Sequence, residues 1–162
     1  MYGGWNCSGS AVKLFVAPGD PSADGAPQDR TSYLANGLVF TWQWPSSFPA
    51  SIQDGTRQTI FFAEGYARAV DRLAWGGKSY DRAVVRRWWE APVWRPFKSA
   101  VMFQAAPALA VADAKLPQGF DPSGIQVAMG DTSVKRVSAE VSAATFYAAC
   151  TPAGNDVLGN DW

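Results

Sequence analysis

The acidic side chains are the first residues in this sequence whose types could do chemistry. Glu64, Glu90 and Glu140 could supply a carboxylate pair of the kind that hydrolyses glycosides, although no shared local context joins any two of them. Glu64 follows a run typical of a buried strand, so its alternative role is a structural hydrogen bond or a pair with an arginine. The chain contains no histidine, which excludes a Ser-His-Asp or Cys-His nucleophile. No glycine motif for phosphates or dinucleotides is present. We therefore expect a protein that is not an enzyme and holds no cofactor.

Clusters of Asp and Asn offer oxygen ligands for calcium, which takes roughly six to eight of them. The weak calcium candidates are Asp121, Asp131, Asp156 and Asp161. None of the surrounding loops matches an EF-hand loop. Because Asx residues beside Gly and Pro usually form turns, the sequence favours turns over a metal site.

Large aromatic side chains in Pro-containing loops and edges form a second possible site. Exposed Trp rings stack on sugars or on a neighbouring subunit, and Arg side chains stack on such rings. The alternative for each ring is a place in a small core beneath a long loop. The interaction candidates are Trp42, Trp44, Arg86, Arg87, Trp88, Trp89 and Trp94.

The two cysteines, Cys7 and Cys150, lie near opposite ends of the chain. They could form a disulfide if the compartment is oxidising. The alternative is two free buried thiols, and the sequence favours neither reading.

Composition and charge limit the classes of partner. The 162 residues are 48% hydrophobic and 17% charged, with no net charge. Nine basic and four acidic residues lie between 57 and 98, whereas both flanking regions are acidic. Overall neutrality argues against nucleic acid, so this asymmetry fits a solvated face or a match between copies of the protein. The run MYGGWNCSGS has no signal-peptide pattern, and no apolar stretch is long enough to span a membrane.

Hydrophobic periodicity predicts a single α+β domain over 1–162, with a mainly antiparallel sheet and one or two short helices. The expected elements are a strand over 11–18, a strand and turn over 31–40, a strand from Thr59 to Ala63, a helix over 66–77, an edge strand and loop over 78–97, an apolar strand and long connection over 99–124, a hairpin over 125–137, and a helix capped by Ser142. Trp162 ends a turn-rich tail. We expect its ring to pack on the sheet or on the last helix, near Phe146 or Tyr147.

Two longer blocks and two shorter upstream pieces resemble one family. SIQDGTRQTIFFAEGYA (51–67) is similar to the family's central block, and the run from Gly124 to Trp162 is similar to its closing block. LFVAPGDPS and SYLANGLVF resemble its upstream pieces. The family is the pilin-like proteins abundant in planctomycetes, which carry a prepilin-type N-terminus and a C-terminal H-x9-DG signature. The signature is degenerate here, since Asp121 stands in place of the His and Thr132 in place of the Gly, and Ala17 replaces an upstream Cys.

The resemblance implies a pseudopilin-like globular head without its apolar N-terminal helix. It implies a non-catalytic assembly subunit of an extracytoplasmic pilus-like, secretion or cell-surface apparatus, whose partners are other protein subunits. Contact with a membrane would come only through the helix that this chain lacks. The alternative function is an extracellular glycan-binding module that uses the loop Trp residues, and an enzyme with paired carboxylates ranks third.

Overall fold

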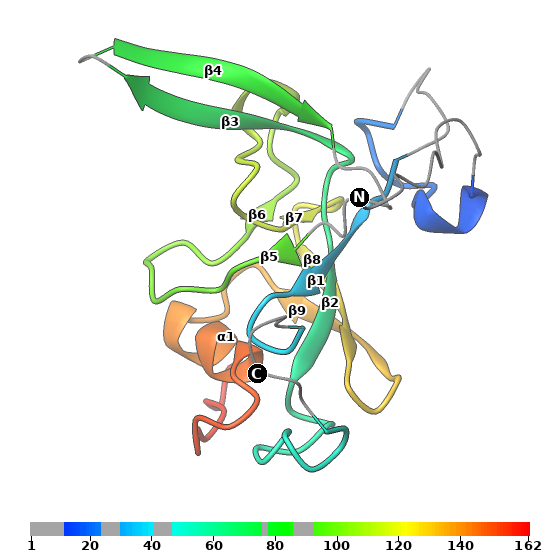
Figure 1. The fold of residues 1–162 in the computed structure, drawn as a ribbon, viewed down its shortest axis with the longest axis vertical. Coiled ribbons are helices and arrows are strands. Elements are labelled where there is room, and N and C mark those ends of the chain that lie inside the picture. Colours follow the sequence, from blue (N-terminus) through cyan, green and yellow to red (C-terminus); the bar gives the residue numbers. More distant parts are fainter. Residues whose placement is uncertain (1–11, 24–29, 41–46, 76–77, 86–92) are drawn as a thin grey trace, which may run out of the picture.

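A mixed five-stranded sheet is the centre of the structure, a computed structural model that describes residues 12–23, 30–40, 47–75, 78–85 and 93–162 (Figure 1). The strand order is β5-β1-β2-β8-β9. The strands are β1 (Tyr33–Asn36), β2 (Ile60–Glu64), β5 (Val93–Trp94), β8 (Gly124–Met129) and β9 (Val134–Ser138). Neighbouring strands are antiparallel except β1 and β5, which are parallel. The α+β fold with a mainly antiparallel sheet is confirmed.

One face of this sheet packs against the main core and against α1 (Ala143–Cys150), the one α-helix in the described part of the chain. Side chains alternate between the two faces of a strand, so every second residue of β1, β8 and β9 points toward this core. In β2 the pairing shifts between Ile60 and Phe62, so Ile60 and Ala63 are its core residues. The core cluster contains Leu34, Ile60, Ala63, Trp94, Met102, Ile125, Val127, Met129, Val137, Phe146, Ala149 and Cys150. We call this side the inner face of the sheet.

The helix α1 has the ends that the sequence predicts. Ser142 is its N-cap, and its Oγ accepts a hydrogen bond from the backbone N–H of Thr145 at 3.2 Å. Phe146, Ala149 and Cys150 are fully buried, as the spacing predicts. The helix stops before the Thr151-Pro152 pair, because proline cannot continue the hydrogen-bond ladder.

The tail after α1 is bonded to the body of the protein. The Asp54 carboxylate accepts hydrogen bonds from the backbone N–H groups of Gly154 and Asn155, at 2.7 and 2.8 Å. Trp162 is half-buried against the main core, and the Nζ atom of Lys135 on β9 lies 4.0 Å from its ring centre. The predicted docking of the terminal ring is therefore confirmed.

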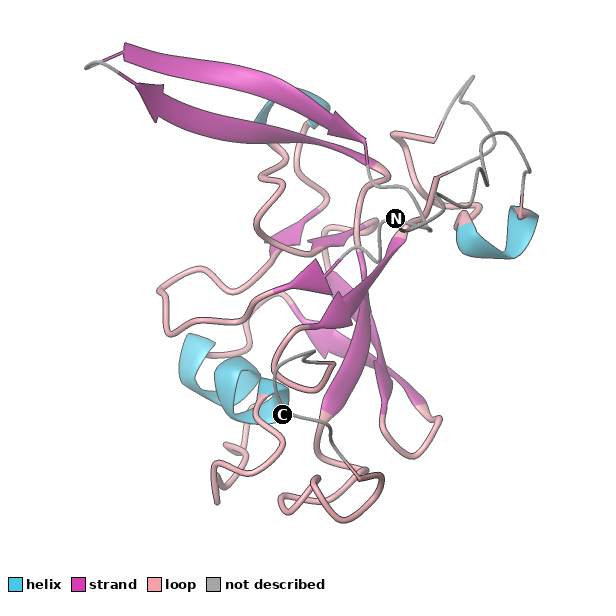
Figure 2. Ribbon diagram, viewed as in Figure 1, coloured by secondary structure: helices cyan, strands magenta, loops and turns pink. Residues whose placement is uncertain are grey.

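A second, smaller group of elements lies above the five-stranded sheet in Figures 1 and 2. It contains the antiparallel pair β3 (Arg68–Trp75) and β4 (Lys78–Val85), the 3-10 turn η3 (Leu109–Val111), and the short parallel pair β6 (Gln104–Ala105) and β7 (Gln118–Gly119). Its own small core contains Tyr66, Ala69 and Ala112, with Phe120 stacked on Tyr66 at 6.1 Å. Loops connect most of these elements, as Figure 2 shows.

The predicted helix over 66–77 is wrong, since most of this segment is β3. The apolar spacing fits a helix, but β3 pairs with β4 along all eight of its residues, and those pairs replace the internal hydrogen bonds of a helix. Two glycines separate β3 from β4 in the sequence, as is typical of a hairpin.

The predicted strand over 11–18 is also wrong. Its described part contains a 3-10 turn, η1 (Lys13–Phe15), in which the N–H of Phe15 donates to the carbonyl of Val12 at 2.9 Å. Leu14 is 85% exposed, so the apolar run faces solvent and does not enter a sheet. The apolar strand expected after residue 99 is likewise reduced to the two residues of β6.

Candidate functional site

The outer face of the five-stranded sheet, opposite α1, carries an unbroken row of apolar residues. The registers place Val93 beside Ala35, Ala35 beside Phe62, Phe62 beside Ala128, and Ala128 beside Val134. The row thus crosses all five strands. Val93, Phe62 and Val134 are 41%, 42% and 67% exposed, so much of this surface is open. We call these five residues the apolar row.

A cluster of phenylalanine rings extends the apolar row toward the turns at one end of the sheet. The ring of Phe40 lies 5.0 Å from that of Phe62 and 5.5 Å from that of Phe61. Phe48 reaches Phe61 at 6.1 Å. Phe61 sits where the pairing of β2 with β8 shifts, and its ring covers Gly130, where any Cβ would lie 2.5 Å from it. Of these four rings, Phe40, Phe48 and Phe62 are exposed, so the apolar surface continues beyond the apolar row.

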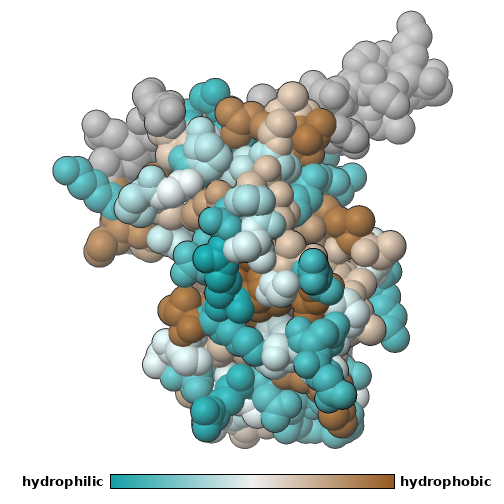
Figure 3. Space-filling model, turned by 180° about the vertical axis from the view of Figure 1, so that it is seen from behind, coloured by the Kyte–Doolittle hydropathy of each residue, from teal (hydrophilic) through white to brown (hydrophobic). Residues whose placement is uncertain are grey.

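A polar row runs beside the apolar row on the same outer face. It contains Tyr33, Glu64, Gln126 and Arg136 in successive strands, and Tyr33 and Gln126 pair with Glu64 and Arg136 respectively. A shallow groove lies between the two rows, lined by Tyr33, Phe62, Glu64, Gln126, Ala128 and Val134 among others. Seen from behind, hydrophobic and hydrophilic residues lie side by side on the surface (Figure 3).

Glu64 is a structural carboxylate of this polar row. One oxygen accepts hydrogen bonds from the backbone N–H groups of Gln126 and Phe120, at 3.0 and 3.2 Å. Burial raises the pKa of Glu64, while these hydrogen bonds and the charge of Arg136 oppose the rise. Its predicted structural hydrogen bond is confirmed. Of the other two glutamates, Glu140 is exposed after β9, and Glu90 lies outside the described residues.

The four calcium candidates lie apart from one another in the sequence, and each accepts hydrogen bonds from nearby groups. Asp121 accepts from the N–H and Oγ of Ser123 and pairs with Arg136, and these contacts, the Ser123 bonds foremost, lower its pKa. Asp131 does the same with Ser133, and its pKa is also lowered.

The tail candidates accept hydrogen bonds from α1 or its C-terminal end. Asp156 accepts from the Thr151 hydroxyl at 2.7 Å, and Asp161 accepts from Ser142 and Thr145. Within the described ranges, no three acidic, cysteine or histidine side chains come together as a metal site would need.

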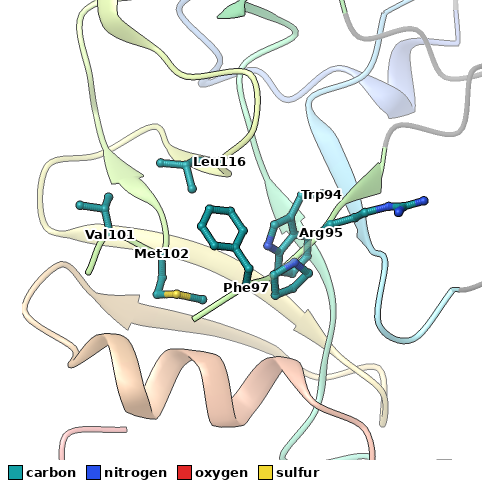
Figure 4. Close-up of a pocket in the computed structure, with 7 residues that line it drawn as sticks. Trp94, Arg95, Phe97, Val101, Met102 and Leu116 are labelled. Atoms are coloured by element: carbon teal, nitrogen blue, oxygen red, sulfur yellow. The ribbon is translucent and has the colours of Figure 1, made fainter. Parts of the chain in front are cut away.

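Trp94 belongs to the core and not to the surface, because only 3% of it is exposed. It lines a small, partly open apolar pocket with Phe97, Met102 and Leu116, while the Arg95 side chain extends away from these residues (Figure 4). The prediction that Trp94 stacks on an outside partner is therefore wrong. The other interaction candidates lie outside the described residues: Trp42, Trp44, Arg86, Arg87, Trp88 and Trp89.

Cys150 carries a free thiol that is fully buried in the main core, and this burial raises its pKa. Cys7 lies outside the described residues, and because the thiol of Cys150 is free, this structure does not contain the possible disulfide between the two cysteines.

Sequence reasoning missed the apolar row. The signal was available in TIFFAE, where apolar residues fall on both parities of the strand and so on both faces of the sheet. The exposed Phe40 and Phe48 could not be found this way, because they lie in turns.

Comparison with known proteins found no relative of this chain. No protein-family model, curated protein or solved structure matches the chain. In the part of the chain that the structure describes, no helix is long and apolar enough to cross a membrane.

Proposed function

We propose that this chain is a non-catalytic assembly subunit of an extracytoplasmic apparatus, either pilus-like, secretory or part of the cell surface. Its partners are other protein subunits, which it contacts through the outer face of the sheet. The proposal rests on one observation, the apolar row that crosses all five strands with Val93, Phe62 and Val134 exposed. Exposed apolar patches on soluble domains mark interaction sites.

The pilin-like resemblance supports the extracytoplasmic setting and the kind of assembly. Its two longest blocks, 51–67 and 124–162, supply β2, β8, β9, α1 and the tail. These segments build the main core and most of the outer face. The segments that resemble the family are therefore the ones that form the core and the sheet, as expected for a structural protein.

The test replaces Phe62 in the native host. Phe62→Glu puts a charge in the middle of the apolar row, and Val157→Glu is the matched control, since Val157 is 90% exposed in the tail and away from this face. We expect the wild type and the control to fractionate with a large surface assembly and to cross-link to neighbouring subunits. Phe62→Glu should lose both properties while keeping its thermal unfolding midpoint within a few degrees. A wild type found only as a free cytoplasmic monomer would contradict the proposal, as would normal assembly of Phe62→Glu.

A second candidate function is binding of an extracellular glycan on the same face. The observation in its favour is that the exposed rings of Tyr33 and Phe62 lie beside the hydrogen-bonding Gln126 in one shallow groove. Aromatic rings flanked by polar groups suit sugar rings. Saturable binding of a polysaccharide by the purified protein, lost in Phe62→Ala, would favour this function. No binding to any of the common polysaccharides would count against this function and leave assembly as the function of this face.

A further inference from the structure

The carboxylate of Glu64, in the groove on the outer face of the sheet, uses only one of its two oxygens within the protein. Oε1 accepts the hydrogen bonds from the backbone N–H groups of Gln126 and Phe120. Oε2 has no hydrogen-bond or ion-pair partner among the described residues, and it is not sealed from the groove. Arg136, whose charge acts on Glu64, is paired with Asp121 instead.

The negative charge of Glu64 is not needed for the hydrogen bonds that hold this side chain. Only 6% of the residue is exposed, and burial raises its pKa, so the ionised form lowers the stability of the folded protein when no cation compensates it. An amide oxygen would accept the same two N–H groups without a charge. A cation that enters the groove would offset the cost of the buried carboxylate.

The groove places two more polar groups beside Glu64. Tyr33 is its cross-strand neighbour on β1, and Gln126 lies next to it on β8. In the described part of the chain, neither the Tyr33 hydroxyl nor the Gln126 side-chain amide has a hydrogen-bond partner. The opposite side of the groove is apolar, with Phe62 and Val134, and the groove has a volume of about 250 Å³. It therefore has room for a single long side chain.

We propose that this groove binds a lysine side chain of a neighbouring subunit, an inference that rests on the assembly function proposed above. The ammonium group donates to Oε2 of Glu64, to the Tyr33 hydroxyl and to the side-chain carbonyl of Gln126. Lysine has three N–H donors and no acceptor, so these three oxygens use all of them. Its four methylene groups lie along Phe62 and Val134, as lysine stems commonly do on apolar surfaces.

Other occupants fit the groove less well than lysine does. Arginine binds a carboxylate best as a fork across both oxygens, and Oε1 of Glu64 already accepts two hydrogen bonds. A metal ion would need further acidic ligands, and the described residues bring no such group together. An apolar side chain would leave the carboxylate buried without a compensating charge.

The first test uses the purified protein with N-acetyl-lysine methylamide as the probe. NMR follows the backbone amides of Gln126 and Ala128, which lie along the groove on β8. We expect these signals to shift saturably with the lysine probe. The norleucine counterpart, which has the same stem without the ammonium group, should bind at least about tenfold more weakly, because charge-assisted hydrogen bonds are roughly twice as strong as neutral ones.

The second test compares two glutamate substitutions with the same probe. Glu64→Gln keeps an acceptor for the two backbone N–H groups, and we expect it to bind the lysine probe as weakly as the wild type binds the norleucine probe. Glu140→Gln is the matched control, since Glu140 is exposed beyond β9, and it should bind like the wild type. The thermal unfolding midpoint of Glu64→Gln at neutral pH should be no lower than that of the wild type, which shows that the fold is intact.

Equal binding of the lysine and norleucine probes would overturn the inference, as would equal binding of the lysine probe by the wild type and Glu64→Gln, or no shift with the lysine probe. These outcomes are separate from those for the proposed function. If Glu64→Gln assembles normally in the native host while Phe62→Glu does not, the assembly function stands and the lysine contact is wrong. If the groove binds the lysine probe through Glu64 while the wild type never fractionates with a surface structure, the lysine site stands and the proposed assembly fails.

Discussion

Asn36 is the polar side chain that joins the most distant parts of the core. It is fully buried at the end of β1. Its amide group donates to the carbonyl of Ile60 on β2 and to that of Cys150 on α1, both at 2.7 Å. Its side-chain oxygen accepts from the N–H of Leu38 at 2.9 Å. One side chain thus ties two strands and the C-terminal end of the helix together.

We expect Asn36→Ala to lower the free energy of unfolding by about 2–4 kcal/mol, because two buried carbonyls and one N–H would lose their partner. The measurement is urea denaturation followed by tryptophan fluorescence. Gln58→Ala is the control, since Gln58 is exposed, and it should stay within about 0.5 kcal/mol of the wild type. A loss for Asn36→Ala no larger than that of the control would refute this role.

Residue roles were predictable only where the partner is near in the sequence. The turn at Asn36-Gly37 could be predicted, because these residue types favour turns. The bonds to Ile60 and Cys150 could not, since they depend on how β1, β2 and α1 meet. Trp94 was misplaced for the same reason: a proline-flanked Trp looks exposed until β5 is seen to pair with β1.

Two side chains cap the N-terminus of α1: the N-cap residue Ser142 and Asp161 from the C-terminal tail. Besides the Ser142 cap, the Asp161 carboxylate accepts from the Ser142 N–H at 2.7 Å and from the Thr145 hydroxyl at 2.6 Å. The hydrogen bond from Thr145 foremost, and those from Ser142, lower the pKa of Asp161 to about 2 from its usual 3.8. A negative charge at this end also complements the helix dipole.

The hydrogen bonds of the Asp161 carboxylate should make the stability of the protein depend on pH in the acidic range. Because folding lowers the pKa of Asp161, its charge contributes stability that is complete above pH 3.8 and is lost as the pH falls toward 2. We therefore expect Asp161→Asn to melt at a lower temperature than the wild type at pH 6, and the gap to narrow between pH 4 and pH 2. The measurement is the melting temperature of both proteins across this pH range. Carboxylates present in both proteins shift both melting temperatures equally and so do not change the difference. A gap that stays constant with pH would rule out the charge as its cause.

At the scale of elements, local signals predicted the C-terminal half better than the middle. The 125–137 hairpin and α1 are marked by strict alternation, a turn and a cap, all read within a few residues. The segment 66–77 has the spacing of a helix, and only its pairing with β4 makes it a strand. Pairing is not visible in a local window, which is why β3 was missed.

At the scale of the whole molecule, the apolar row on the outer face of the sheet is the surface that the proposed assembly would use. Contact with another subunit would cover this row through hydrophobic burial. From the sequence, the basic region between 57 and 98 fitted either a solvated face or a match between copies of the protein. Neither reading located the apolar row, because that row forms only when β5, β1, β2, β8 and β9 pair in register.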